Sequence, residues 1–339
     1  MLLVLSTVVL SGCEDKNIII TTDFEEGELM RINTLSCYVS EMMLYLTNAR
    51  NDYEKVFGSE IWTKSLNGRE LSESIKDMVL AKVAQVKVMN LMAEDYEITL
   101  SEDDLNTIKE RAAAYYDTLS PKEIELTGAT LETVEGIFKE YVIANRVYAY
   151  IIKDINPEIS DDEARTVTVQ HILIKTYGLS GDGKRFEYTK RARDEARKKA
   201  EEIREMAVSE EEPVDFELLA AEYNEDDETT YSFGRGEMAQ AFEDAAFMLD
   251  NGEISEVVET EFGYHIIKCV STFDVDETQQ NKVKIVKERQ EKVFEETYNS
   301  FVVGIKKNLN EDLYASIKLI TDEDVTTSSM FSDEYLGGL

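Results

Sequence analysis

The sequence predicts an α+β domain of roughly one hundred residues with helical segments on both sides of it. From Val39 to Ile155, apolar residues recur at three- and four-residue spacing, which is typical of amphipathic helices. At Arg165 the period changes, and short β-branched runs then alternate with helical stretches. Helical periodicity returns beyond Phe273.

Size and charge limit the classes of function. A chain of 339 residues with 43% apolar and 31% charged residues is long enough for two or three globular domains. Its 36 basic residues against 70 acidic ones give a net charge of −34, which repels phosphate backbones and anionic lipid headgroups. No nucleic-acid partner is therefore expected. A cationic or unfolded polypeptide remains open, although such a charge also simply favours solubility.

The N-terminus has the features of an export signal. The apolar run from Leu2 to Leu10 is nine residues long, too short to span a bilayer but suited to the core of a signal peptide. The run ends in Leu10-Ser11-Gly12-Cys13, which resembles the bacterial lipobox, so we expect residues 1–13 to be a lipoprotein signal with Cys13 as the lipidated residue. The protein would then sit on the extracytoplasmic face of the cell membrane, held by its lipid.

One feature and one alternative leave this interpretation open. No Lys or Arg precedes the apolar run, which fits a translation start a few codons further upstream. The alternative is a buried N-terminal strand followed by an incidental Cys13.

Apart from Cys13, only Cys37 and Cys269 occur in the sequence, and two cysteines do not make a disulfide scaffold. We expect two inert buried thiols, with a bridge between distant segments as the alternative.

The N-terminal half is predicted to be a tether followed by helices. Residues 14–35 are acidic and mixed, with a short strand at 17–22, and are expected to form the tether. Residues 36–162 are expected to form a helical segment. Within it, Ser101 and Ser160 are each followed by acidic residues and so predict helix starts, because the hydroxyl caps backbone amides and the helix dipole favours negative charge.

Residues 163–273 are predicted to be the α+β domain, with strands around a turn at Phe262-Gly263 and one strand between the second and third helices. The predicted elements are a strand at Thr166–Thr176, helices at Lys184–Met206, Phe216–Tyr223 and Gln240–Leu249, and strands within Ile254–Val270. A long helix is expected in 274–320. Residues 321–339 have little periodicity and are expected to be disordered.

Methionines are frequent in the N-terminal helical segment. They could line an adaptable groove for varied partners, because thioethers are soft and flexible, or they could simply pack in the core. The residues concerned are Met42, Met43, Met78, Met89 and Met92.

Only two histidines occur, in the phrases Gln-His171-Ile-Leu-Ile-Lys175 and Tyr-His265-Ile-Ile-Lys268. Each imidazole opens a β-branched run at the same end of its predicted strand, so neighbouring strands would bring the two rings together. A pair of core histidines is the simplest interpretation. Zinc is the rival, but the 93 residues between His171 and His265 offer no ligand spacing and no third ligand converges, so neither a metal nor another cofactor is expected.

Motifs between the histidines favour a third interpretation. They are Phe233-Gly-Arg-Gly-Glu-Met238-Ala-Gln-Ala-Phe242, Gly252-Glu-Ile-Ser255 and Phe262-Gly-Tyr-His265. In this order, over residues 166–270, they resemble the parvulin-type peptidyl-prolyl isomerases. Together with the lipobox and the helical flanks, the whole chain resembles the PrsA-type foldase lipoproteins, relatives of the SurA chaperone.

This resemblance implies a small antiparallel sheet with surrounding helices, inserted between segments of an all-α chaperone module whose 274–320 part packs on the N-terminal part. It also implies the site residues: His171, Asp226 and His265 as catalytic residues, and Met238, Phe242 and Phe262 as the apolar cup for the proline ring. The loop from Asp226 to Phe233 lacks the family's glycine-rich turn, so Asp227 or Thr230 could stand in for Asp226.

The function implied is cis–trans isomerisation of X-Pro bonds in exported proteins, with unfolded or newly exported polypeptides as partners and a homodimer left open. The segment after the first strand, Thr176–Ser180, has no adjacent arginines, so no preference for phosphorylated substrates is expected. The alternative is a non-catalytic holdase with a degenerate parvulin domain. A lipid-anchored protein that binds a small solute fits poorly, because no second α/β domain is visible.

Overall fold

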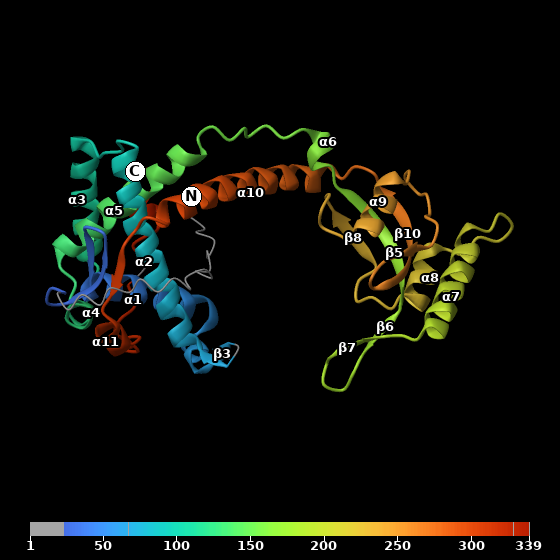
Figure 1. Cartoon of the computed structure of the whole chain (residues 1–339), viewed down its shortest axis with the longest axis horizontal. Coiled ribbons are helices and arrows are strands. Elements are labelled where there is room, and N and C mark those ends of the chain that lie inside the picture. The colour runs from blue at the N-terminus through green and yellow to red at the C-terminus, as the bar shows by residue number, and fades with distance from the viewer. Residues whose placement is uncertain (1–23, 67, 328, 339) are drawn as a thin grey trace. The chain divides into compact units, whose positions relative to one another are not determined.

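The computed structural model describes residues 24–66, 68–327 and 329–338, which fold into two compact units (Figure 1). The described residues up to Asp154 and those from Gln290 onward make up the helical unit, and Ile155–Arg289 make up the α+β unit. Both units contain small antiparallel sheets among helices, and the predicted fold class is confirmed.

A four-stranded antiparallel sheet organises the α+β unit, in the order β8-β5-β10-β9. The long central strands, β5 and β10, pair along their whole length. Their apolar, β-branched sequences fit this central position, where both faces are covered. The strands are β5 (Val167–Lys175), β8 (Thr230–Phe233), β9 (Val258–Glu259) and β10 (Gly263–Ser271).

Strand parity assigns each face of this sheet to different helices, because successive side chains of a strand point to opposite faces. Ile172 and Ile266 pack with α7 (Lys190–Val208) and α8 (Phe216–Tyr223). On the other face, Val169 and Ile267 pack with α9 (Gln240–Met248). His171 and His265 are odd-numbered residues of these strands, as Val169 and Ile267 are, and they therefore face α9.

A hairpin precedes α7 where the sequence predicted helix. The expected helix from Lys184 begins only at Lys190, because Arg185–Glu187 form β7 and pair with β6 (Tyr177–Leu179). Gly178 makes this possible, since a Cβ there would lie 2.5 Å from the Phe186 ring. The charge pattern of this segment suits an exposed strand as well as a helix, so periodicity could not separate the two.

Five helices form most of the helical unit, and their apolar faces share one core. A buried ion pair network joins three of them: Lys87 on α2 lies 3.0 Å from Glu41 on α1 and 2.7 Å from Glu140 on α5. Ser101 caps α3 with a complete capping box, as predicted. The helices are α1 (Val39–Phe57), α2 (Leu71–Asp95), α3 (Glu102–Tyr116), α4 (Pro121–Thr127) and α5 (Leu131–Ile152).

Several short elements and the long helix expected in 274–320 complete the description of the chain. Ser160 caps α6 through its side chain, which confirms the second predicted helix start. The elements are a 3₁₀ helix (Ser59–Thr63), the hairpin β3 (Ser65–Leu66) and β4 (Arg69–Glu70), and the helices α6 (Asp161–Ala164), α10 (Val275–Val302), α11 (Glu311–Ser316) and α12 (Asp333–Leu336).

A three-stranded sheet in the helical unit pairs an early strand of the chain with one that follows α10, in the order β11-β1-β2. Its strands are β1 (Glu28–Ile32), β2 (Leu35–Tyr38) and β11 (Lys307–Leu309). The tether expected at 14–35 is therefore wrong for its described part, since Leu29 and Ile32 are fully buried. The run Glu-Leu-Met-Arg-Ile is short and acidic at its start, which hid its strand character. The strand expected at 17–22 lies outside the described residues.

The disordered tail expected at 321–339 is also wrong for the residues described. Val325 and Met330 are fully buried, and Tyr335 and Leu336 belong to the core of the helical unit. The described part of the segment consists of turns, irregular stretches and the short helix at Asp333–Leu336, and it inserts single apolar side chains, so it has no period that the sequence could reveal. Its composition resembles that of a disordered region because only a few side chains enter the core.

Cys37, Cys269 and most of the five methionines singled out above are structural. Cys37 is buried in the helical unit and Cys269 in the α+β unit, and both are free thiols, as expected. Met42, Met89 and Met92 are fully buried, which favours core packing over a groove. Among the described residues, no helix is both long and apolar enough to cross a bilayer.

Gly263 fixes the start of β10. Its φ of +147° lies in a region that side chains rarely adopt, and a Cβ would lie 2.1 Å from the Ile174 carbonyl oxygen. We therefore expect Gly263→Ala to lower the free energy of unfolding of the α+β unit by at least about 2 kcal/mol. Denaturant unfolding of the full chain, with hydrogen exchange in β5 and β10, measures this. Gly181→Ala, in open space, is the control; an equal effect in both variants would contradict the prediction.

Candidate functional site

The two imidazoles meet on the α9 side of the sheet. In the antiparallel register His171 pairs with Ile267 and His265 with Leu173, so the histidines are diagonal neighbours on one face. Their rings stack at 5.6 Å between centroids, with Nδ1 to Nδ1 at 3.4 Å. The sequence predicted that the two rings meet, on the ground that each His stands at the same end of its own strand. The diagonal of an antiparallel pair brings them together instead.

A chain of hydrogen bonds fixes the tautomer of each ring. Nε2 of His171 lies 3.2 Å from the Glu228 carbonyl oxygen, which only accepts, so this nitrogen carries the proton. Nδ1 of His171 then accepts from Nδ1–H of His265, whose Nε2 in turn accepts from the Thr260 hydroxyl at 2.8 Å. The Thr260 oxygen itself accepts from the Phe262 backbone N–H. Every donor therefore points the same way along the chain of groups.

Burial keeps both rings neutral. It lowers the pKa of His171 below the ordinary 6.5, even though the Glu228 carbonyl and the Asp226 carboxylate act in the opposite direction. For His265, burial and then the neighbouring His171 lower the pKa to about 3. A neutral pair matches the Nδ1 contact, because one nitrogen must lack a proton to accept. The histidines thus orient their neighbours and do not titrate near pH 7.

Asp226 lies at the rim of this pair. Its Oδ2 is 3.4 Å from Nε2 of His171 and accepts from the Tyr231 hydroxyl at 3.1 Å, while the side chain remains 29% exposed. Asn224 holds the loop in place: its Oδ1 accepts from the Leu173 backbone N–H, and its Nδ2 donates to the carbonyls of Asp226 and Glu228. The short loop is thus tied to β5, and it places Asp226 beside His171.

Phe242 forms the apolar wall. Its ring meets His171 edge-on at 5.5 Å and His265 at 5.1 Å, and it is 4% exposed. Met238 packs on the same cluster of the sheet and α9, and it is half-buried. The loop that carries Met238 is fixed by Glu243, whose carboxylate accepts from the Gly236 backbone N–H. Five of the six predicted positions therefore lie around one face of β5 and β10.

Phe262 lies at a different edge. Its ring is 39% exposed, and it packs against Tyr177 of β6 at 6.5 Å and below Arg185 of β7. Its backbone N–H joins it to the histidine chain through Thr260. Phe262 thus connects the hydrogen-bond chain to the hairpin that follows β5.

Three residues with a clear place in this geometry were not predicted. Thr260 orients His265, Tyr231 binds Asp226 and contacts the His171 ring at 5.2 Å, and Asn224 holds the loop. Tyr231 could have been found, because it lies two residues before Phe233 in the same strand and its side chain therefore points to the same face. Thr260 and Asn224 act through turns whose geometry the sequence does not reveal.

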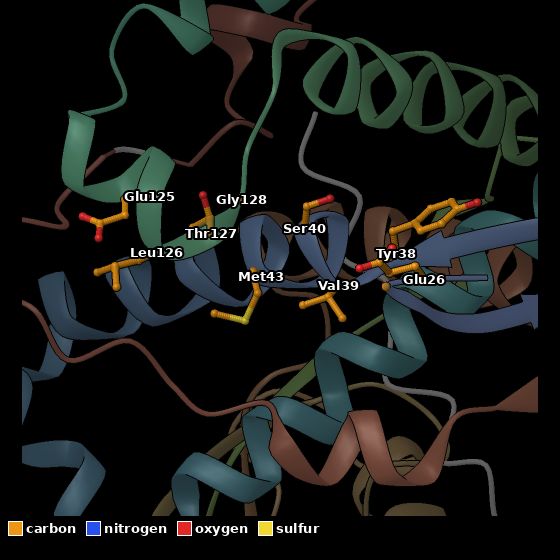
Figure 2. Close-up of a pocket in the computed structure, with 10 residues that line it drawn as sticks. Glu26, Tyr38, Val39, Ser40, Met43, Glu125, Leu126, Thr127 and Gly128 are labelled. Carbon is orange, nitrogen blue, oxygen red and sulfur yellow. The ribbon is translucent and has the colours of Figure 1, made fainter. Parts of the chain in front are cut away.

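No metal-ligand geometry accompanies the pair within the described part of the chain, where no group of three or more His, Cys, Asp or Glu side chains could hold an ion. A pocket of about 470 Å³ lies elsewhere, in the helical unit (Figure 2). Figure 2 shows Val39 and Met43 of α1, Tyr38 at the end of β2, and Leu126 and Thr127 of α4 around it. It contains none of the residues predicted for the site.

Comparisons with known proteins agree with this geometry. Residues 171–271 match the family model of the rotamases, described as the PPIC-type PPIase domain. The foldase protein PrsA of Caldanaerobacter subterraneus is 26% identical over 264 residues, covering 74% of this chain and 76% of the relative. Foldase protein PrsA 4 of Bacillus cereus is 27% identical over 277 residues, covering 77% of this chain and 83% of the relative.

Among solved structures, the peptidyl-prolyl isomerase PrsA of Bacillus cereus matches with a TM-score of 0.36 and 22% identity, covering 80% of this chain and 97% of that one. Residues 171–271 are thus a peptidyl-prolyl cis–trans isomerase domain of the parvulin type. Over most of its length the chain is similar to the foldases named PrsA.

The neutral histidine pair makes a spectroscopic prediction. In protein labelled with ¹⁵N at its two histidines, we expect the Nε2–H tautomer for His171 and the Nδ1–H tautomer for His265, with His265 still neutral near pH 4. Thr260→Val removes the hydroxyl that donates to His265 and should mix its tautomers, whereas Thr260→Ser should not. Titration of His265 near pH 6.5 would contradict this assignment.

The same shifts predict how stability depends on pH. Folding lowers both histidine pKa values, that of His265 to about 3, so below about pH 6.5 the unfolded chain binds protons that the folded chain does not, and for His265 this window extends to about pH 3. The free energy of unfolding should therefore fall as pH decreases through this window, by up to about 1.4 kcal/mol per pH unit for each histidine. Urea unfolding of wild type and His265→Gln measures it, and the variant should show the smaller slope.

Proposed function

We propose that the face of β5 and β10 that bears the histidine pair is the catalytic site of this isomerase. Rotation about an X-Pro bond meets a barrier of about 18–20 kcal/mol because the planar amide is stabilised by resonance. Lowering it needs no covalent step. It needs a site that binds the twisted amide better than the planar one, and each 1.4 kcal/mol or so of that preference speeds rotation tenfold.

In this proposal Phe242 and Met238 grip the proline ring. Phe242 offers a flat buried wall and Met238 an adaptable, half-buried one, so a pyrrolidine ring can be held while the rest of the peptide turns. Phe262, exposed at the neighbouring edge, closes the cup on the substrate side. The observation that carries the proposal is the packing of Phe242 edge-on against both imidazoles, because it joins the apolar cup to the polar chain.

Asp226 supplies the electrostatic part. A planar amide places partial negative charge on its carbonyl oxygen, and this charge decreases as resonance is lost on twisting. A carboxylate facing that oxygen therefore destabilises the planar state more than the twisted one. His171 and Tyr231 hold the Asp226 carboxylate from behind, so it can face the substrate without losing its orientation. The histidines act as positioning residues.

We further infer that the helical unit holds unfolded segments of newly exported polypeptides. The PrsA-like character of most of the chain and the lipobox-like Leu10–Cys13 support an extracytoplasmic foldase anchored through lipid at Cys13. A homodimer is compatible with this proposal, and sedimentation equilibrium of the purified chain would reveal it.

The catalytic site is tested with the full chain and an X-Pro peptide, whose uncatalysed isomerisation takes tens to hundreds of seconds. We expect Phe242→Ala and Met238→Ala to lower kcat/KM at least tenfold and Asp226→Asn to lower it by a smaller factor. Met248→Ala, on the same helix but 82% exposed, is the matched control and should have no effect. Equal activity of Phe242→Ala and wild type would sink the assignment.

The lipid anchor is tested in a bacterium that expresses the full chain. We expect Cys13 to incorporate radiolabelled palmitate and the protein to sediment with membranes, because a thioether-linked lipid holds it there. Cys13→Ser should abolish the label and release the protein, while Cys37→Ser, at a buried thiol, should do neither. Labelling that persists in Cys13→Ser would exclude this anchor.

A further inference from the structure

The C-terminal segment, defined as residues 322–327 and 329–338, is held largely through its backbone. Side chains of the helical unit bind its carbonyls and amides, so these contacts do not depend on which residues the segment carries. On α1, Arg50 donates to the Val325 carbonyl at 2.7 Å, Asn51 donates to the Thr327 carbonyl at 2.9 Å, and Asn48 accepts from the Met330 N–H. On α3, Arg111 donates to the Tyr335 and Gly337 carbonyls at 3.2 and 2.8 Å.

Apolar side chains of the segment fill sites between these backbone contacts. Phe331 is inserted between Tyr45 and Tyr141, at 4.8 Å from each ring, and the Lys82 ammonium lies 4.5 Å from the centre of its ring. Val325 and Met330, which precede Phe331 in the segment, are fully buried. The pattern is that of a bound peptide: polar groups recognise the main chain, and pockets accept occasional large apolar residues.

The fit around Phe331 is incomplete. The hydroxyls of Tyr45 and Ser332 are buried but have no hydrogen-bond partner among the described residues. Each such group costs about 1–3 kcal/mol when it is desolvated without a partner. A segment selected only as core would be expected to avoid these losses. A ligand that must be exchangeable tolerates them.

We propose that α1, α3 and α5 form a peptide groove that the C-terminal segment fills in the free chain, and that an unfolded polypeptide with spaced apolar residues displaces it. The inference rests on the proposed role of the helical unit as the client-binding unit. Because the segment is tethered to α11 by a few residues, it competes at a high effective concentration. Only clients with several apolar residues in reach would bind, so the segment sets a threshold for client binding.

The test uses full-length wild type and full-length Phe331→Ala, which removes the central anchor of the segment. A fluorescein-labelled peptide of residues 322–338 with Phe331 retained is titrated into each, and fluorescence anisotropy gives Kd. We expect binding to Phe331→Ala to be at least tenfold tighter than to wild type, because the groove is vacated. The same peptide with Phe331→Ala should bind neither chain well. Reduced, carboxymethylated α-lactalbumin should displace the labelled peptide.

Equal Kd values for both chains, binding to neither, or no displacement by saturating α-lactalbumin would each overturn the inference. If Phe331→Ala loses its helical circular dichroism, Val325→Ala takes its place, because Val325 belongs to the segment and its loss leaves the groove residues unchanged. Hydrogen exchange in unmodified wild type gives a second measurement: exchange of the Met330 region should increase when α-lactalbumin is added, and unchanged exchange would overturn the inference. Isomerase activity on a short X-Pro peptide should be equal in all chains, so a failed inference leaves the proposed catalytic site standing.

Discussion

Nearly every feature of the catalytic unit depends on the antiparallel register of β5 and β10. Pairing of His171 with Ile267 sends both imidazoles to the face that α9 covers, and it sends Ile172 and Ile266 to the face that α7 and α8 cover. A slip by one residue would exchange these faces and place both imidazoles among aliphatic side chains. The close approach of Gly263 to the Ile174 carbonyl sets where this pairing starts, so a residue without a side chain sets the register of the pair.

The two histidines form one polar unit without carrying charge, because all the hydrogen bonds that join them to their neighbours run in the same direction. Thr260 supplies a proton donor at one end, and the Glu228 carbonyl and Asp226 carboxylate supply acceptors at the other. Each ring is thus both donor and acceptor. Burial makes a charged ring costly, and the same burial strengthens the bonds between neutral rings. The substrate would meet an ordered site and would not have to reorganise it.

Sequence patterns predicted much of this unit and less of the helical one. The β-branched apolar runs of β5 and β10, helical spacing in α8 and α9, and the hydroxyl before α3 are local signals, and they predicted the right elements. Partners such as Thr260 and Asn224 act across turns, where the residue type alone does not reveal which way the side chain points. The buried strand β1 and the C-terminal segment were missed because each inserts only a few apolar side chains among acidic neighbours. Both segments are held in place by contacts with residues that are distant in the sequence.

The placement of the two internal thiols has a practical consequence. Cys37 lies fully buried in the helical unit and Cys269 fully buried in the α+β unit, and burial raises the pKa of both thiols, so the folded chain keeps them unreactive. A thiol reagent can then modify each cysteine only when its own unit opens. The rate at which Cys37 is modified thus reports the opening of the helical unit, and the rate for Cys269 reports that of the α+β unit. The order in which the two units unfold can be followed without any added label.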